Sequence, residues 1–283
     1  MNVSPTPKSL ILNLLQAADG HPLSASDAVR AASLFGIREN SVRVALVRLA
    51  AAGLLASAGR GAYRLGPQAT GMADELSGWR HAERRTCPWN GDWVMVATGD
   101  LGRSDRSALR TRQRALALLG LRELTPTLHV RPANLVGGAA ALRERLYRLG
   151  LDAGTPVFLA QHLGTALEAR ARQLWNGQAL SQAYQRTHQQ LQDWLAHSGS
   201  LDLDTAARES YLLGNDAIRQ LVFDPLLPEP LVDVQARQTF TATVIAFDQA
   251  GHQIWQRLLS TPPSQTIPEE TPHAHHPQRH TTH

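Results

Sequence analysis

RENSVRVALVRLAAAGLLASAGRGAYRL, residues 38–65, is the stretch that decides the fold. Its first half has apolar residues at helical spacing and ends at Gly53, and its second half is two short segments around a Gly-Arg-Gly turn at 59–61. This pattern predicts a helix followed by a β-hairpin. One face of the helix is expected to be buried, at the i, i+3, i+4 and i+7 positions Val42, Ala45, Leu46 and Leu49.

Two further helices are predicted before this one. Residues 9–18 have apolar side chains at a helical period and are followed by Asp19-Gly20. Ser24 and Asp27 have the spacing of a capping box ahead of a second helix that ends at Gly36. Three helices and a hairpin within residues 1–68 indicate a winged helix-turn-helix domain. The second helix is expected to bury Ala28, Val29, Ala32 and Phe35.

The outward face of the third helix and the hairpin predict contacts with double-stranded DNA. The N-terminal side chains of a recognition helix meet base edges, where Asn suits adenine and Arg suits guanine, and Arg and Ser also bind phosphates. Outward valines fit thymine methyl groups. The alternative is a winged helix that binds protein. The predicted DNA-binding residues are Arg38, Asn40, Ser41, Arg43, Val44, Val47 and Arg48 at the helix, and Arg60 and Arg64 on the hairpin.

Composition and charge agree with this interpretation. A chain of 283 residues with 43% hydrophobic residues suits two or three domains. Cys87 is the only cysteine, no apolar run has the length of a membrane span, and the first residues lack a signal-peptide pattern, so a cytoplasmic location is expected. Residues 1–70 contain seven Lys/Arg and three Asp/Glu, whereas residues 171–283 contain seven and eleven. A basic front suits presentation of the N-terminal part to a polyanion.

The hydrophobic pattern changes after a polar connector at residues 69–91, in which Trp79 and Trp89, together with the nearby Trp93, are expected to dock domains. Residues 93–98 predict a strand, 104–119 a helix, 121–131 a hairpin bent at Pro126, 133–149 a second helix and 155–161 a last strand. This βαββαβ order is that of a ferredoxin-like domain, here at residues 92–168, whose sheet often pairs across a dimer.

The last part of the chain predicts a mainly helical domain at residues 169–262. Apolar residues recur at helical spacing in 169–174, 181–197 and 204–223. Asp224-Pro225 is expected to terminate a helix and dock the last one. Residues 263–283 are rich in Pro, Thr and His without a core pattern, which indicates disorder. The fold class is therefore α+β.

Three blocks along the chain resemble the PaaX-like regulators, which are repressors of phenylacetate breakdown. They are SVRVALVRLAAAGLL at 41–55, PWNGDW at 88–93 and IRQLVFDPLLPEPL at 218–231. The resemblance implies a homodimer that binds pseudo-palindromic promoter DNA without a cofactor and is released by an aryl-acetyl-CoA such as phenylacetyl-CoA. Phe223 stands where the family usually has arginine, and Val232-Asp-Val-Gln replaces the Trp-Pro-Gly that often follows. These departures suggest a different acyl-CoA effector.

The effector that the resemblance implies carries several phosphate charges, so its site needs arginines or helix N-termini. Such a site is expected between the middle and C-terminal domains. The alternative is that these arginines are surface charge or form salt bridges across a dimer. The candidates are Arg106, Arg110, Arg112 and Arg114 on the middle-domain helix, and Arg219 before the FDPLLP segment.

The rival from another class is a metal-dependent nuclease. The middle domain resembles the small nuclease subunit of CRISPR adaptation, and Asp100 follows its first strand at the position of a metal-binding aspartate. A phosphodiesterase needs several carboxylates close together, but the sequence shows no second carboxylate cluster, and Asp105 has the pattern of a helix-start residue. No catalytic or specific metal site is predicted. At most, opportunistic binding of Zn²⁺ or Ni²⁺ is expected from the histidines of the tail, which are His273, His275, His276, His280 and His283.

Overall fold

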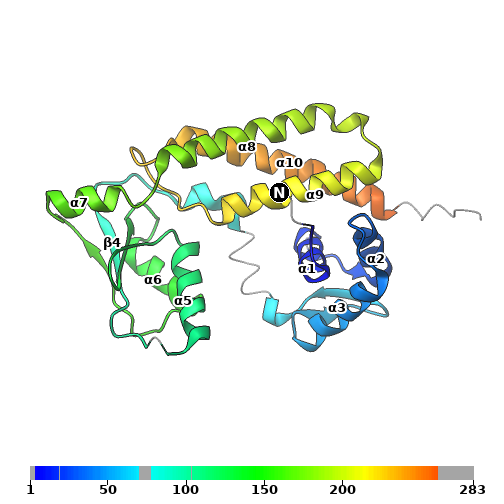
Figure 1. The fold of residues 1–283 in the computed structure, drawn as a ribbon, viewed down its shortest axis with the longest axis horizontal. Coiled ribbons are helices and arrows are strands. Elements are labelled where there is room, and N and C mark those ends of the chain that lie inside the picture. Colours follow the sequence, from blue (N-terminus) through cyan, green and yellow to red (C-terminus); the bar gives the residue numbers. More distant parts are fainter. Residues whose placement is uncertain (1–3, 19, 70–77, 103, 261–283) are drawn as a thin grey trace, which may run out of the picture.

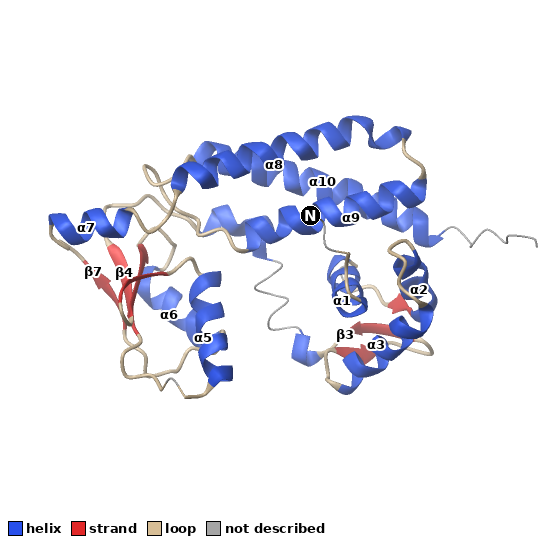
Figure 2. Cartoon of the chain, viewed as in Figure 1, coloured by secondary structure: helices blue, strands red, loops and turns tan. Residues whose placement is uncertain are grey.

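Three consecutive units make up the chain, and the fold is α+β as predicted (Figure 1). The structure is a computed structural model and describes residues 4–18, 20–69, 78–102 and 104–260. Long C-terminal helices form a layer along one side of the molecule, and the N-terminal and middle units both lie on the other side of this layer (Figure 2). Within the described ranges, no helix is long and apolar enough to cross a membrane.

The N-terminal unit consists of three helices and a small antiparallel sheet. The helices are α1 (Pro7–Ala17), α2 (Ala25–Ser33) and α3 (Glu39–Ala51). The sheet has the order β1-β3-β2 and contains the predicted hairpin, β2 (Leu55–Ser57) and β3 (Ala62–Leu65). Strand β1 (Leu23–Ser24) was not predicted, because two residues are too few to produce an alternating pattern.

Capping side chains fix where the first two helices begin. Helix α1 begins at Pro7, earlier than predicted, because the Thr6 hydroxyl accepts a hydrogen bond from the Ser9 amide and proline is tolerated in the first turn. Ser24 caps α2 as predicted, accepting from the Asp27 amide at 3.0 Å. Inside this unit α3 buries Val42, Leu46 and Leu49 as predicted, whereas Ala45, Val29 and Phe35 are only partly buried.

The middle unit has the predicted order of elements, β–α–β–β–α–β, in one antiparallel sheet of order β5-β6-β4-β7. Helix α6 begins five residues later than predicted because Gly137, at φ 81°, is left-handed and ends the preceding turn. The elements are β4 (Trp93–Ala97), α5 (Arg106–Leu118), β5 (Arg122–Thr125), β6 (Leu128–Pro132), α6 (Gly138–Arg148) and β7 (Val157–Ala160).

The sheet of the middle unit is covered on both faces. Val94 and Val96 pack with Leu116 of α5 and Leu146 of α6. The alternate residues of β4 belong to the core of the C-terminal unit, in which the Trp93 ring stacks on Trp175 at 6.2 Å between centroids. The prediction that the connector tryptophans dock units together agrees with these contacts.

Four helices form the C-terminal unit: α7 (Thr165–Arg172), α8 (Gly177–His197), α9 (Leu203–Val222) and α10 (Val234–Ser260). Two short 3-10 helices, η1 (Gly78–Arg85) and η2 (Ser198–Ser200), lie before the middle unit and between α8 and α9. Helix α10 packs along both α8 and α9 but was not among the predicted helical stretches. The predictions for residues 70–77 and for the tail at 263–283 lie outside the described residues.

The N-terminal unit is seated on the C-terminal helices through a polar and aromatic contact. The Asn13 side-chain amide donates to the Tyr211 hydroxyl at 3.1 Å and to the Asn215 carbonyl oxygen at 2.9 Å. The Tyr211 ring meets Phe35 edge-on at 5.1 Å and also contacts Trp255 of α10. Burial raises the pKa of Tyr211 to about 12, so its hydroxyl stays protonated in this seat.

Neighbouring side chains of α3 provide a matched test of this packing. Leu46→Ala should destabilise the N-terminal unit by about 2–5 kcal/mol, because it leaves a cavity beside α1 and α2. Val47→Ala should change stability by less than about 0.5 kcal/mol, because Val47 is 66% exposed. Hydrogen exchange of amides in this unit measures both free energies. Equal effects would mean that the buried face of α3 is misassigned.

Candidate DNA-binding surface and junction pocket

The outward face of α3 presents polar, charged and apolar side chains together. Every α3 residue predicted to bind DNA is exposed, because Val42, Leu46 and Leu49 occupy the core. Val44 and Val47, one helical turn apart, are 40% and 66% exposed. The resulting surface combines an apolar strip with hydrogen-bonding groups, which is the combination that reads base edges in the major groove.

An ion pair within α3 engages one of its arginines. The Arg43 guanidinium contacts the Glu39 carboxylate at 2.6 Å across one helical turn, and both side chains are more than half exposed. Exposed pairs of this kind contribute little to stability, about 0.3–0.5 kcal/mol. Arg43 can therefore exchange Glu39 for an external anion at little cost.

The hairpin places two more arginines beside this surface. Gly59 and Gly61 have φ values of 126° and 71°, which β-carbon-bearing residues rarely adopt, and they allow the tight turn that exposes Arg60. Arg64 is exposed on β3 opposite Ala56. All nine predicted DNA-binding residues, Arg38 included, thus lie on the surface of one small unit.

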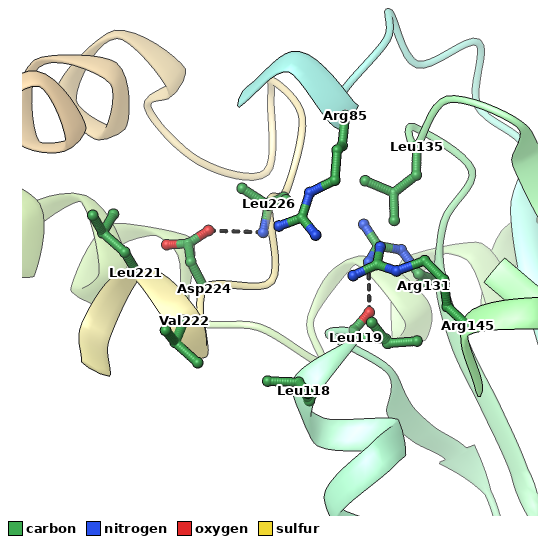
Figure 3. A pocket seen from close by; sticks show the side chains of 10 residues that line it. All are labelled: Arg85, Leu118, Leu119, Arg131, Leu135, Arg145, Leu221, Val222, Asp224 and Leu226. Atoms are coloured by element: carbon green, nitrogen blue, oxygen red, sulfur yellow. Dashed lines mark hydrogen bonds between the residues drawn. The ribbon is translucent and has the colours of Figure 1, made fainter. Parts of the chain in front are cut away.

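A second candidate site is a pocket where the middle and C-terminal units meet (Figure 3). Its wall combines three arginines with one carboxylate and a rim of leucines. The enclosed space is about 20 Å³, which is room for roughly one water molecule. The lining residues are Arg85, Leu118, Leu119, Arg131, Leu135, Arg145, Leu221, Val222, Asp224 and Leu226.

Arg131 is the most buried charge in this pocket, at 2% exposed. It donates hydrogen bonds to neutral oxygens, including the carbonyls of Leu119 at 2.5 Å and Pro225 at 3.1 Å. Burial, together with the nearby charge of Arg145, lowers the pKa of Arg131 to about 9. Because Leu119 ends α5 and Pro225 follows α9, this guanidinium ties the two units together.

Several side-chain hydrogen bonds hold the turn after α9 in place. Asp224 accepts from the Leu226 amide at 2.7 Å and from the Tyr184 hydroxyl. Asn134 donates to the Leu226 carbonyl at 2.7 Å, and Arg237 donates to the Leu227 carbonyl at 2.6 Å. Asp224-Pro225 thus follows the end of α9 and contributes to docking, as predicted.

The predicted effector-site arginines are not part of the lining of this pocket. Arg106, Arg110, Arg114 and Arg219 are exposed and do not line it. Arg112, grouped with them and expected on the surface, is 6% exposed and pairs with Asp152 at 3.2 Å. The sequence did not predict the pocket arginines, because they come from three separate elements, η1, β6 and α6. The one available signal was Arg131, an arginine beside apolar residues in the middle of a sheet.

The residues of the nuclease alternative do not converge. Asp100 is exposed after β4, and Asp105 caps α5 by accepting from the Ser107 amide at 2.7 Å, as its pattern predicts. Across the described ranges, no three His, Cys, Asp or Glu side chains lie close enough together to hold a metal ion. Cys87 is partly buried.

Three helices, of which the third exposes arginines, are also the elements of a helix-turn-helix unit, in which one helix enters the major groove of DNA. The chain belongs to the PaaX-like family: the PaaX-like protein family matches residues 6–69, and the PaaX-like protein C-terminal domain matches residues 175–257. Together they cover just over half of the chain. This family indicates a transcriptional regulator and is not a family of enzymes.

Comparison with solved structures finds the same fold in an uncharacterized protein, Rv0674 from Mycobacterium tuberculosis. The TM-score is 0.60 at 24% sequence identity, over 89% of this chain and 98% of that chain. No curated protein matches the chain.

Two aspartates at opposite ends of α9 should differ in their effect on stability with pH. Burial raises the pKa of Asp224, so the folded state keeps a proton that the unfolded chain has lost, and the stabilising contribution of Asp224 falls as pH rises above about 4. The Thr205 amide lowers the pKa of Asp202, so its contribution is lost as pH falls below about 4.

Urea unfolding of Asp224→Asn and Asp202→Asn between about pH 3 and 7 measures these trends. The stability difference between wild type and Asp224→Asn should shrink with rising pH, whereas that for Asp202→Asn should grow. Growth for both variants would mean that Tyr184 and Arg237 stabilise ionised Asp224 more than burial destabilises it.

Proposed function

We propose that this protein is a dimeric transcriptional repressor of an aromatic-acid catabolic operon, released from promoter DNA by an aryl-acetyl-CoA such as phenylacetyl-CoA. The observation that carries the proposal is the outward face of α3, where arginines, Asn40 and two valines are exposed beside a hairpin with Arg60 at its tip. In this proposal the N-terminal unit is a winged-helix domain and the middle unit is a ferredoxin-like domain.

In this proposal α3 enters the major groove and the hairpin lies on the phosphate backbone. Asn40, Arg43 and Arg48 contact base edges or nearby phosphates, and the valines contact thymine methyl groups. Two copies of the chain place their α3 helices about 34 Å apart on a pseudo-palindromic site. Arg60 and Arg64 add contacts that depend on charge and not on sequence, so binding weakens steeply with salt.

The effector is proposed to bind at the junction pocket, because this is where several arginines and an apolar rim come together. The thioester's anionic groups pair with Arg85 and Arg145, and its acyl part contacts the leucine rim. Since the enclosed space is only about 20 Å³, the middle and C-terminal units must separate to admit the ligand.

Helix α9 supports a route from the pocket to the DNA-binding unit. Its last residues, Leu221 and Val222, line the pocket, and Tyr211 and Asn215 on the same helix hold Asn13 of the N-terminal unit. Val222 lies eleven residues, or about 16 Å, along the helix from Tyr211. A shift of α9 on effector binding would change the orientation of both α3 helices in the dimer. To move the equilibrium from 1:99 to 99:1, the effector must favour the released state by about 5.5 kcal/mol.

Opposite changes in α3 test DNA binding. Arg48→Ala should weaken binding to DNA selected in vitro by the wild-type protein by roughly 5- to 150-fold, which corresponds to the loss of roughly 1–3 kcal/mol. Glu39→Gln should strengthen binding, because it removes a negative charge and releases Arg43. Fluorescence anisotropy gives both affinities. The control is Arg186→Ala on α8, which should have no effect. Unchanged affinity for both α3 variants would sink the recognition-helix assignment.

Calorimetry with phenylacetyl-CoA, free phenylacetate and CoA tests the effector. Heat is expected from the thioester. Arg145→Ala should weaken the affinity for the thioester about tenfold or more, because a charge-assisted contact is worth roughly 1.5–3 kcal/mol. The control is Arg219→Ala, which changes an exposed arginine near the end of α9 that does not line the pocket. Heat from the free acid alone would remove the thioester hypothesis, and an effect of Arg219→Ala alone would move the site out of the pocket.

A further inference from the structure

Helix α5 carries a row of three exposed arginines that neither the pocket nor the recognition helix uses. Arg106, Arg110 and Arg114 lie at i, i+4 and i+8, so they follow one face of the helix over about 12 Å. The fourth arginine of the helix, Arg112, points into the protein and pairs with Asp152. We call the three exposed residues the arginine row.

Within the part of the chain that the structure describes, no ion pair neutralises the arginine row. Residues 106–118 contain no Asp or Glu. Asp105 uses its carboxylate to accept from the amides of Ser107 and Ala108, at 2.7 and 3.2 Å. Among the described residues, no carboxylate forms an ion pair with any arginine of the row. Like charges at i, i+4 spacing repel each other, so the row disfavours the free helix and favours a bound polyanion.

We propose that the arginine row is a second nucleic-acid contact, which binds the phosphate backbone of duplex DNA that flanks the site read by α3. This inference rests on the proposed DNA-binding function and extends it to the middle unit. Arginines bind phosphates without reading sequence. A row of about 12 Å spans roughly seven phosphate charges of a duplex, enough for each arginine to find a partner.

The place of α5 in the fold favours this partner. The middle and N-terminal units lie on the same side of the α8–α10 layer, and α5 is on the edge of the middle unit toward the N-terminal unit (Figure 1). A duplex held by α3 and continuing past the site is therefore a polyanion within reach of this side of the molecule. The exposed neighbours of the row are polar or small, whereas a membrane-binding helix would present large apolar side chains to insert. They are Ser107, Ala108, Thr111, Gln113 and Ala117.

Full-length protein tests the proposal on two duplexes. One contains only the site selected in vitro by the wild-type protein, and the other adds random sequence on both sides. The row variant is Arg110→Gln/Arg114→Gln. The control is Arg186→Gln/Arg208→Gln, which removes the same charge from exposed positions on α8 and α9.

The row variant should lose affinity for the flanked duplex, with a slope of log affinity against log salt that is smaller by roughly 3.6, since each copy of the dimer loses two phosphate contacts and each contact contributes about 0.9. On the short duplex it should match wild type, and the control should match wild type on both. Arg110→Lys/Arg114→Lys should keep the flank effect, because lysine also binds phosphate as a point charge. This variant, together with circular dichroism, separates a lost contact from a lost fold.

An equal loss in the control pair, or an unchanged salt slope in the row variant, would overturn the proposal. The same holds if the row variant loses affinity equally on both duplexes, or if the protein binds phosphatidylserine vesicles through the row without any flank effect on DNA. Failure of the proposed function gives a different result: wild type and Arg48→Ala would then bind the selected site and random DNA alike, whatever the flanks.

Discussion

The buried guanidinium of Arg131 is the constraint on which the arrangement of the middle and C-terminal units depends. A charge at 2% exposure is tolerated only when its N–H groups have acceptors, and Arg131 finds them on three separate segments: the end of α5, its own strand β6, and the turn after α9. Removing any of these acceptors would leave a buried cation unsatisfied. The middle sheet, α5 and α9 therefore keep this relative position unless water or a ligand replaces the acceptor that Arg131 loses when the units separate.

Two kinds of contact join the middle and C-terminal units, apolar and polar. The Trp93–Trp175 stack and the large C-terminal core are apolar and tolerate small sliding movements. The polar contacts around Asp224, Asn134 and Arg237 are directional and have few alternative arrangements. An interface that contains such directional contacts has few alternative arrangements, which suits the proposed switch between a DNA-bound and a released state.

Much of the fold could be predicted from the sequence, because it depends on local patterns. The spacing of Val42, Leu46 and Leu49 set both the core of α3 and its outward residues, and the Gly-Arg-Gly turn marked the hairpin. The order of strands and helices in the middle unit followed from changes of period. Helix α10 was not picked out, although residues 169–262 were expected to be mainly helical. Two features contribute: its apolar residues are only weakly gathered on one side of the helix, and the buried side includes Thr241 and Thr243.

The junction pocket could not be predicted, because its arginines become neighbours only through tertiary packing. Arg85, Arg131 and Arg145 lie in three elements with no common spacing. The regular i, i+4 row on α5 was predicted to bind the effector instead, since periodic charge is visible in a sequence. The row is exposed and lies outside the pocket. Arg112 shows the limit of such reasoning: within the same arginine-rich helix, one position in four turned inward to meet Asp152.

The small size of the junction pocket has a consequence for the timing of a response. In the proposed mechanism, a thioester does not fit into a space of about 20 Å³, so it binds only during intervals in which the units have separated. At high ligand concentration the rate of capture then levels off at the rate of opening, and the apparent affinity is reduced by the fraction of time spent open. Brief pulses of ligand would pass unnoticed, and the protein would respond to sustained exposure.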